Sequence, residues 1–76
     1  ARVLRPGAEA SVPFDDLRAL LRALGFAERV GGSHHVFVRP GVEEIVNLQR
    51  DGRHAKPYQV RQARAVLGKF NLRLQA

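Results

Sequence analysis

The sequence predicts an α+β domain with the order α-β-β-β-α, in which two helices cover one face of a three-stranded antiparallel sheet. Three observations favour this class: an apolar stripe at helical spacing near the start, three short strand-like runs separated by turn residues, and a second helical stretch near the end. Antiparallel sheets commonly bury one face against helices and leave the other open. The 76 residues suffice for one such domain.

The first helix is expected around Pro13, because a missing N–H is tolerated in a first helical turn. Asp15 and Asp16 follow, where the helix dipole favours negative charge. The apolar stripe then consists of leucines at i, i+3, i+4 and i+7: Leu17, Leu20, Leu21 and Leu24. Gly25 suits the end of the helix, since glycine adopts the left-handed conformation without steric cost. The preceding segment has no clear periodicity, so residues 1–12 are expected to be an N-terminal arm on a domain of residues 13–76.

Three runs after this helix predict an antiparallel meander. Residues 26–30 are short and mixed, residues 34–39 are rich in β-branched and aromatic side chains, and residues 42–49 follow as a third strand. Turn residues separate them, with Gly-Gly-Ser at 31–33 and Pro-Gly at 40–41.

A basic loop at residues 50–56 leads to a second helix that begins at Pro57 and extends to Phe70. Its apolar face is expected to hold Val60, Ala63, Leu67 and Phe70, with Gln59, Arg61, Gln62 and Arg64 mostly pointing elsewhere. Residues 71–74 are the candidate for a further short strand.

The positive charge is segregated along the chain. The net charge is +6, and after Ile45 seven Lys and Arg residues face a single acid, Asp51, whereas the charges before it balance. This segregation favours a binding face for a polyanion such as nucleic acid over the alternative, a merely solvated cationic surface.

Composition excludes several other classes. The chain has no cysteine, which rules out disulfides and thiolate metal sites and fits a reducing compartment. No apolar run approaches the roughly 18 residues that a membrane span needs, and no signal-peptide pattern opens the chain. We therefore expect a cytoplasmic protein without a membrane partner.

The stretch Gly-Gly-Ser-His-His-Val places two histidines side by side at a strand start. Side chains alternate along a strand, so His34 and His35 point to opposite faces. Phe37 is bulky and is expected to face the helices together with His35, which leaves His34 on the open face with Val36 and Val38. The reverse assignment stays open, because both valines are also apolar.

Chelation of a metal by adjacent histidines on opposite faces is geometrically poor, so no metal or cofactor is expected. Acid–base chemistry suits a histidine better, because its proton exchanges near neutral pH. RNA cleavage needs a base for the 2′-OH and donors for the phosphate. Candidate donors are the turn amides of Gly32 and Ser33 and the cations Lys56, Arg61 and Arg64. From residue types alone, a structural histidine is the alternative.

The stretch GGSHHVFVRPG, preceded by a Leu-rich helix ending in LGF and followed by IVNLQ and AKPYQVRQARAVL, resembles the HicA family of small toxins. The resemblance runs from about Val12 to Leu74. It implies a double-stranded-RNA-binding-like fold and a ribonuclease that cleaves messenger RNA (an mRNA interferase) and is inhibited by a HicB antitoxin. The first histidine of the Gly-Ser-His-His motif is the family's active residue, which is His34 here, and Gly32 and Ser33 match the residues before it.

We therefore expect His34 to act as the base toward the 2′-OH, with Gly32 permitting close approach of the RNA backbone. A second acid–base group is not selected by the spacing: His35, His54 and Tyr58 are all candidates, as is cleavage by one histidine. The rival functions are a non-catalytic double-stranded-RNA-binding module and a DNA-binding regulator. The latter is disfavoured because no helix is paired with the second one as a helix-turn-helix requires.

Overall fold

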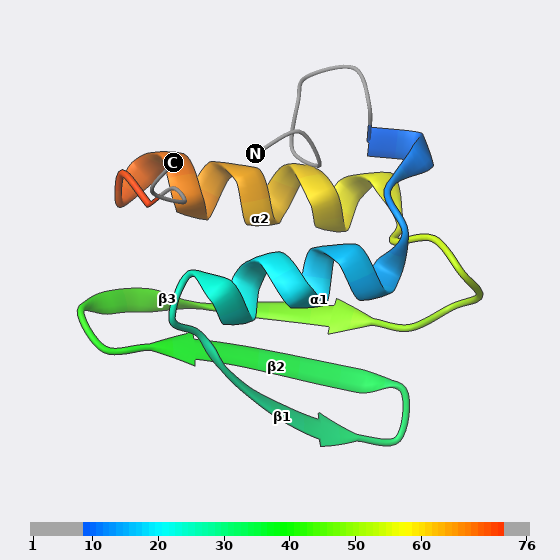
Figure 1. Cartoon of the computed structure of the whole chain (residues 1–76), viewed down its shortest axis with the longest axis horizontal. Helices are drawn as coiled ribbons and strands as arrows, with labels where there is room; N and C mark the ends of the chain where they lie inside the picture. Colours follow the sequence, from blue (N-terminus) through cyan, green and yellow to red (C-terminus); the bar gives the residue numbers. More distant parts are fainter. Residues whose placement is uncertain (1–8, 73–76) are drawn as a thin grey trace.

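The computed structural model describes residues 9–72 and has the expected order of elements (Figure 1). The elements are η2 (Glu9–Ser11), a turn of 3-10 helix, then α1 (Phe14–Ala23), β1 (Ala27–Gly31), β2 (His34–Arg39), β3 (Val42–Gln49) and α2 (Pro57–Lys69). The sheet is antiparallel with β2 in the centre. The predicted α+β class and α-β-β-β-α order are confirmed. No helix in the described range is long and apolar enough to cross a membrane.

Burial alternates along the strands as the pleat of a sheet requires. In β2, His35 and Phe37 are buried whereas His34 is exposed, and in β3 the buried residues are Val46 and Leu48. Both helices lie on the side of these buried residues (Figure 1). The other face of the sheet is open, and the predicted separation of the two histidines is confirmed.

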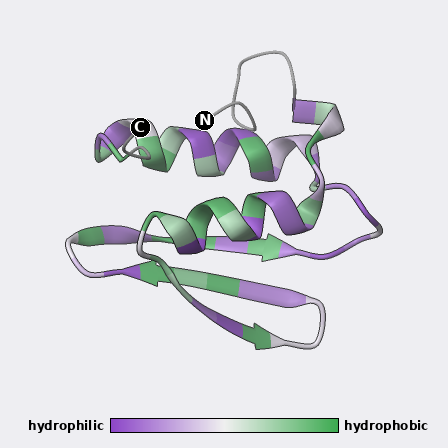
Figure 2. Cartoon of the chain, viewed as in Figure 1, coloured by the Kyte–Doolittle hydropathy of each residue, from purple (hydrophilic) through white to green (hydrophobic). Residues whose placement is uncertain are grey.

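The core lies between the helices and the sheet, and Figure 2 shows the hydrophobic positions that both helices contribute. The leucine stripe of α1 is buried as predicted. From α2 the core receives Val60, Ala63, Val66 and Leu67, while Phe70 packs at its margin. Gln59 was expected to point away from this core. That expectation is wrong, because Gln59 is only 1% exposed. Its Nε2 donates to the Gln49 carbonyl at 3.4 Å, which satisfies a polar group at the sheet's end.

Several boundaries differ by one residue from the expected ones, among them the end of α2, which lies at Lys69 with Phe70 as the C-cap. Helix α1 begins at Phe14, because Pro13 has an extended ψ of 138° and is the N-cap. Strand β1 begins at Ala27, because Phe26 is buried in the core and its N–H completes the end of α1; the strand then continues to Gly31.

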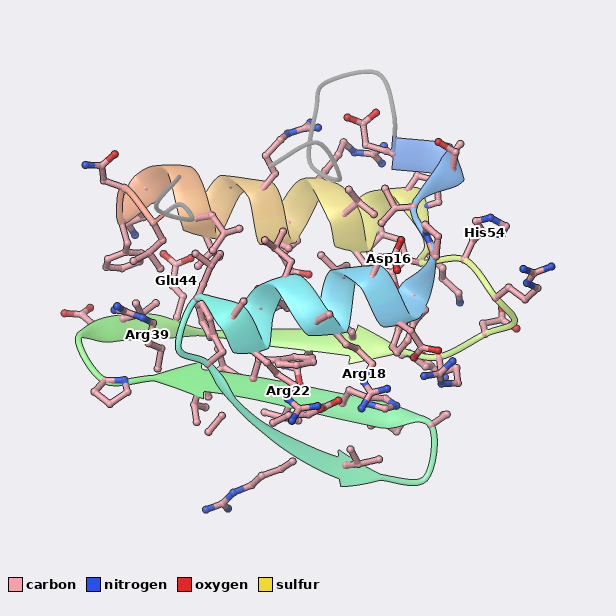
Figure 3. The ribbon with its side chains drawn as sticks, viewed as in Figure 1. Asp16, Arg18, Arg22, Arg39, Glu44 and His54 are labelled. Carbon is pink, nitrogen blue, oxygen red and sulfur yellow. The ribbon has the colours of Figure 1, made fainter. Side chains whose placement is uncertain are left out.

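The end of α1 is closed by Gly25, as predicted. Its φ of 96° lies in the left-handed region, and the N–H groups of Gly25 and Phe26 each bond to a carbonyl of the last helical turn at 3.0 Å. Arg39 of β2 adds a third donor, with its Nε 2.8 Å from the Leu24 carbonyl. Arg39 is labelled in Figure 3. The far end of β2 is thereby joined to the end of α1.

The segment before α1 pairs with the loop before α2. Val12 is buried and its carbonyl accepts the N–H of Ala55 at 2.8 Å, while the N–H of Phe14 donates to the Arg53 carbonyl at 2.8 Å. Residues 9–12 of the expected arm therefore pack against the domain. The rest of that arm lies outside the described residues.

The end of α2 resembles that of α1. Asn71 takes a positive φ of 56°, and the N–H of Leu72 bonds to the Leu67 carbonyl at 2.8 Å. These two residues were the first half of the candidate strand at residues 71–74, and they close the helix instead. The second half lies outside the described residues.

Candidate active site

His34 is the first residue of β2 and directly follows a tight turn of Gly32 and Ser33. Gly31 pairs with His34 across this turn, and Gly32 has a φ of 59°, a conformation that favours glycine. On its other side His34 pairs with Gln49, the last residue of β3. The His34 side chain is exposed on the open face, where a ligand can reach it.

Three polar side chains surround His34 on this face. Directly paired residues of antiparallel strands share a face, so Gln49 lies beside His34. Arg29 and Asn47 are both paired with Val36, two residues along β2, and so lie diagonally from His34. All three are exposed. Sequence reasoning missed them, because they are identified by the register of the strands.

His35 lies on the covered face and is held by two contacts. Its Nδ1 is 2.8 Å from Glu28 Oε2, and its ring meets the Phe14 ring edge-on, with centroids 5.0 Å apart at 70°. The expectation that His35 faces the helices together with Phe37 is confirmed. Its ring is separated from that of His34 by the sheet.

Arg18 holds the other end of Glu28. The Arg18 Nε and Nη2 donate to Oε2 and Oε1 of Glu28 at 2.6 and 3.1 Å, a two-point pairing of guanidinium with carboxylate. Hydrogen bonding from Arg18 lowers the pKa of Glu28 to about 2. Burial of the carboxylate acts in the opposite direction, and the hydrogen bond with His35 lowers the pKa further. The same bond raises the pKa of Arg18. Arg18 is labelled in Figure 3, on α1.

Asp15 and Arg50 complete this set of contacts. Arg18 Nη1 donates to Asp15 Oδ1 at 2.9 Å, and Arg50 Nη2 donates to the same oxygen. Both hydrogen bonds lower the pKa of Asp15, and the bond from Arg50 has the larger effect. The Arg50 guanidinium also lies 4.5 Å from the Phe14 ring centroid. We call these residues the α1 network: Phe14, Asp15, Arg18, Glu28, His35 and Arg50.

The three cations predicted to bind phosphate lie on the helix side of the molecule. Lys56 is the N-cap of α2, at the end of the molecule where β3 ends beside His34, and its Nζ is 3.7 Å from Asp51. Arg61 and Arg64 lie farther along α2, which runs away from that end (Figure 1). Arg64 forms an ion pair with Glu9, whereas Arg61 is exposed and has no ion pair with any of residues 9–72. The structure therefore gathers Gly32 and Ser33 at His34, places Lys56 at the same end, and leaves the two arginines more distant.

Unlike the buried His35, the two other candidates for a second acid–base group are exposed. His54 lies in the loop before α2 and its side chain points outward in Figure 3, while Tyr58 is 54% exposed on α2. Within residues 9–72, no side-chain hydrogen bond or ring contact links either of them to His34. The described residues also contain no group of three His, Asp or Glu side chains placed to hold a metal.

Comparison with known protein families gives a match. A family model described as the HicA toxin of bacterial toxin-antitoxin systems matches residues 14–68, from the start of α1 almost to the end of α2. No curated protein and no solved structure matches the chain.

Proposed function

Since this chain belongs to the HicA toxin family of bacterial toxin–antitoxin systems, we propose that it is a metal-independent ribonuclease that cleaves messenger RNA in the cytoplasm and is neutralised by a HicB-type antitoxin. The observation that carries this proposal is the position of His34. Its imidazole is exposed on the open face, while the residues on both sides of it are fixed in the fold.

The proposed chemistry uses His34 as a general base. It accepts the proton of a ribose 2′-OH, and the freed oxygen attacks the adjacent phosphorus. The bond from phosphorus to the 5′-oxygen breaks, which leaves a cyclic phosphate and a new 5′-OH once that oxygen is protonated. The second acid–base group stays open. His35 is poorly placed for this role, because it is buried on the other face.

The turn and the nearby cations would hold the RNA. A Cβ at Gly32 would meet no atom within 4 Å, so the turn leaves room for a phosphate to approach the N–H groups of Gly32 and Ser33. Lys56 would contact a neighbouring phosphate, since its exposed pair with Asp51 is weak and readily exchanged. Arg61 and Arg64 would bind phosphates farther along the chain of the RNA.

The antitoxin would act by covering the open face. Besides His34, this face exposes apolar side chains, with Val38 36% and Ile45 50% exposed. Such residues suit contact with a protein. A complex in which His34 stays fully exposed and undistorted would contradict this mode of inhibition.

The test is incubation of the purified protein with labelled RNA in the presence of EDTA. We expect cleavage that disappears in a His34→Ala variant with an unchanged circular dichroism spectrum and is partly restored by added imidazole. RNA binding without cleavage by the unaltered protein would overturn the proposal in favour of a non-catalytic double-stranded-RNA-binding module.

A further inference from the structure

The residue before His34 is tied to the first turn of α1. The Ser33 carbonyl accepts the backbone N–H of Arg50 at 2.8 Å, just beyond the paired ends of β2 and β3. The side chain of Arg50 in turn bonds to Asp15 and lies over the ring of Phe14. One residue therefore connects the turn before His34 to two consecutive residues of α1.

The residue after His34 is tied to the same two positions by a different route. The ring of His35 packs against Phe14, which is fully buried, and its Nδ1 is bound by Glu28. Glu28 is held by Arg18, whose Nη1 bonds to Asp15. Both routes thus end at Phe14 and Asp15. The contacts of the α1 network therefore connect the residues on either side of His34 to the same turn of α1.

His34 itself has no side-chain hydrogen bond to any of residues 9–72. The direction of its imidazole therefore depends on where the backbone of β2 begins. A catalytic group has to be held within about 0.5 Å of its productive position, and a misplacement of about 1 Å costs up to about 100-fold in rate.

We propose that Asp15 and Arg50 are positioning residues for RNA cleavage: they fix the Ser33–His35 backbone so that the imidazole of His34 meets the 2′-OH. This inference rests on the proposed function of His34. It assigns a catalytic consequence to an exposed carboxylate that, as an isolated surface charge, would contribute little.

Asp16 supplies a matched control for Asp15. It lies in the same helical turn, carries the same charge and is exposed, but it has no hydrogen bond or ion pair with another described side chain. Asp15→Asn and Asp16→Asn therefore remove the same charge from a basic protein and the same favourable interaction with the helix dipole. Through charge alone, either change would strengthen binding of the polyanionic RNA.

The experiment measures kcat and KM for RNA cleavage in both variants, together with their thermal midpoints. We expect Asp15→Asn to lower kcat about tenfold with KM unchanged or lower, whereas Asp16→Asn retains the kcat of the unaltered protein. Arg50→Lys keeps a cation that can reach Asp15, so we expect this variant to retain more of the kcat of the unaltered protein than Arg50→Gln does.

Equal kcat values for the two aspartate variants would overturn the inference, provided that cleavage depends on His34. An Asp15→Asn defect that disappears when both variants are assayed far below their thermal midpoints would also overturn it, because the residue would then only stabilise the fold. Absence of any His34-dependent cleavage would instead reject the proposed function, and the positioning role with it.

Discussion

Nδ1 of His35 lies 2.8 Å from Oε2 of Glu28, and the two side chains are only 7% and 8% exposed. A buried polar group that loses its partner retains the full cost of leaving water. This pair therefore makes the neighbouring histidines energetically different, although the sequence places them side by side.

The first prediction concerns the two histidines. We expect His35→Ala to lower the free energy of unfolding by about 2–4 kcal/mol, because it opens a space beside Phe14 and removes one of the two hydrogen-bond partners of Glu28 Oε2, leaving Arg18 as the other. The change His34→Ala should alter it by less than about 0.5 kcal/mol. Urea denaturation followed by circular dichroism measures both, and similar losses in the two variants would contradict the assignment of faces.

The second prediction concerns acid stability. The pKa of Glu28 falls from an ordinary value of 4.5 to about 2 in the folded protein, so the unfolded chain binds more protons between these values. The stabilisation from Glu28, roughly 3 kcal/mol, is complete above about pH 4.5 and is lost as the pH falls toward 2. A Glu28→Gln variant should show a flatter decline over this range. The exposed Glu43 serves as control, since Glu43→Gln should leave the decline unchanged when urea midpoints are plotted against pH.

A third prediction tests the turn. Gly32 has a φ of 59°, whereas its neighbour Gly31 does not have a positive φ, and a Cβ at either position would meet no atom within 4 Å. The comparison therefore isolates backbone conformation from steric contact. We expect Gly32→Ala to destabilise the fold by about 1 kcal/mol and Gly31→Ala to be neutral or slightly stabilising. Equal thermal midpoints in the two variants would contradict this account of the turn.

The fourth prediction ranks the α2 arginines in RNA binding. Arg61 is free of ion pairs with described residues, whereas Arg64 already neutralises Glu9. An Arg61→Gln variant should therefore reduce the slope of log affinity against log salt by about 0.7. The slope should change less in Arg64→Gln, because the positive charge of Arg64 is already partly neutralised by Glu9. Fluorescence titration of labelled RNA at several salt concentrations gives both slopes, and a larger change in Arg64→Gln would reverse the ranking.

The order of elements could be predicted because helices and strands follow local periods that survive in a single sequence. The leucine stripe and Gly25 defined α1, and the alternation around Phe37 separated His34 from His35. The α1 network could not be predicted, because its bonds join residues 10 and 35 positions apart and depend on how the elements pack.

The position of Gln59 shows the same limit on one helix. Its polarity suggests an outward direction, but the carbonyl at the end of β3 supplies a partner that only the folded chain brings near. Likewise, charge alone grouped Arg61 and Arg64 with His34, whereas the direction of α2 carries them away from it. Charge segregation along a sequence therefore does not show on which surface of the fold the charged side chains lie.

Helix α1 is fastened to β2 at both ends, through Arg39 and the Leu24 carbonyl at one end and through the α1 network at the other. A partner that bent the central strand would have to break contacts at both ends of the helix at once. Screening His34 from RNA disturbs neither end, and so requires less free energy. We therefore expect a partner to inhibit the protein by blocking access of RNA to His34 and not by changing the fold. Activity should return as soon as that partner dissociates.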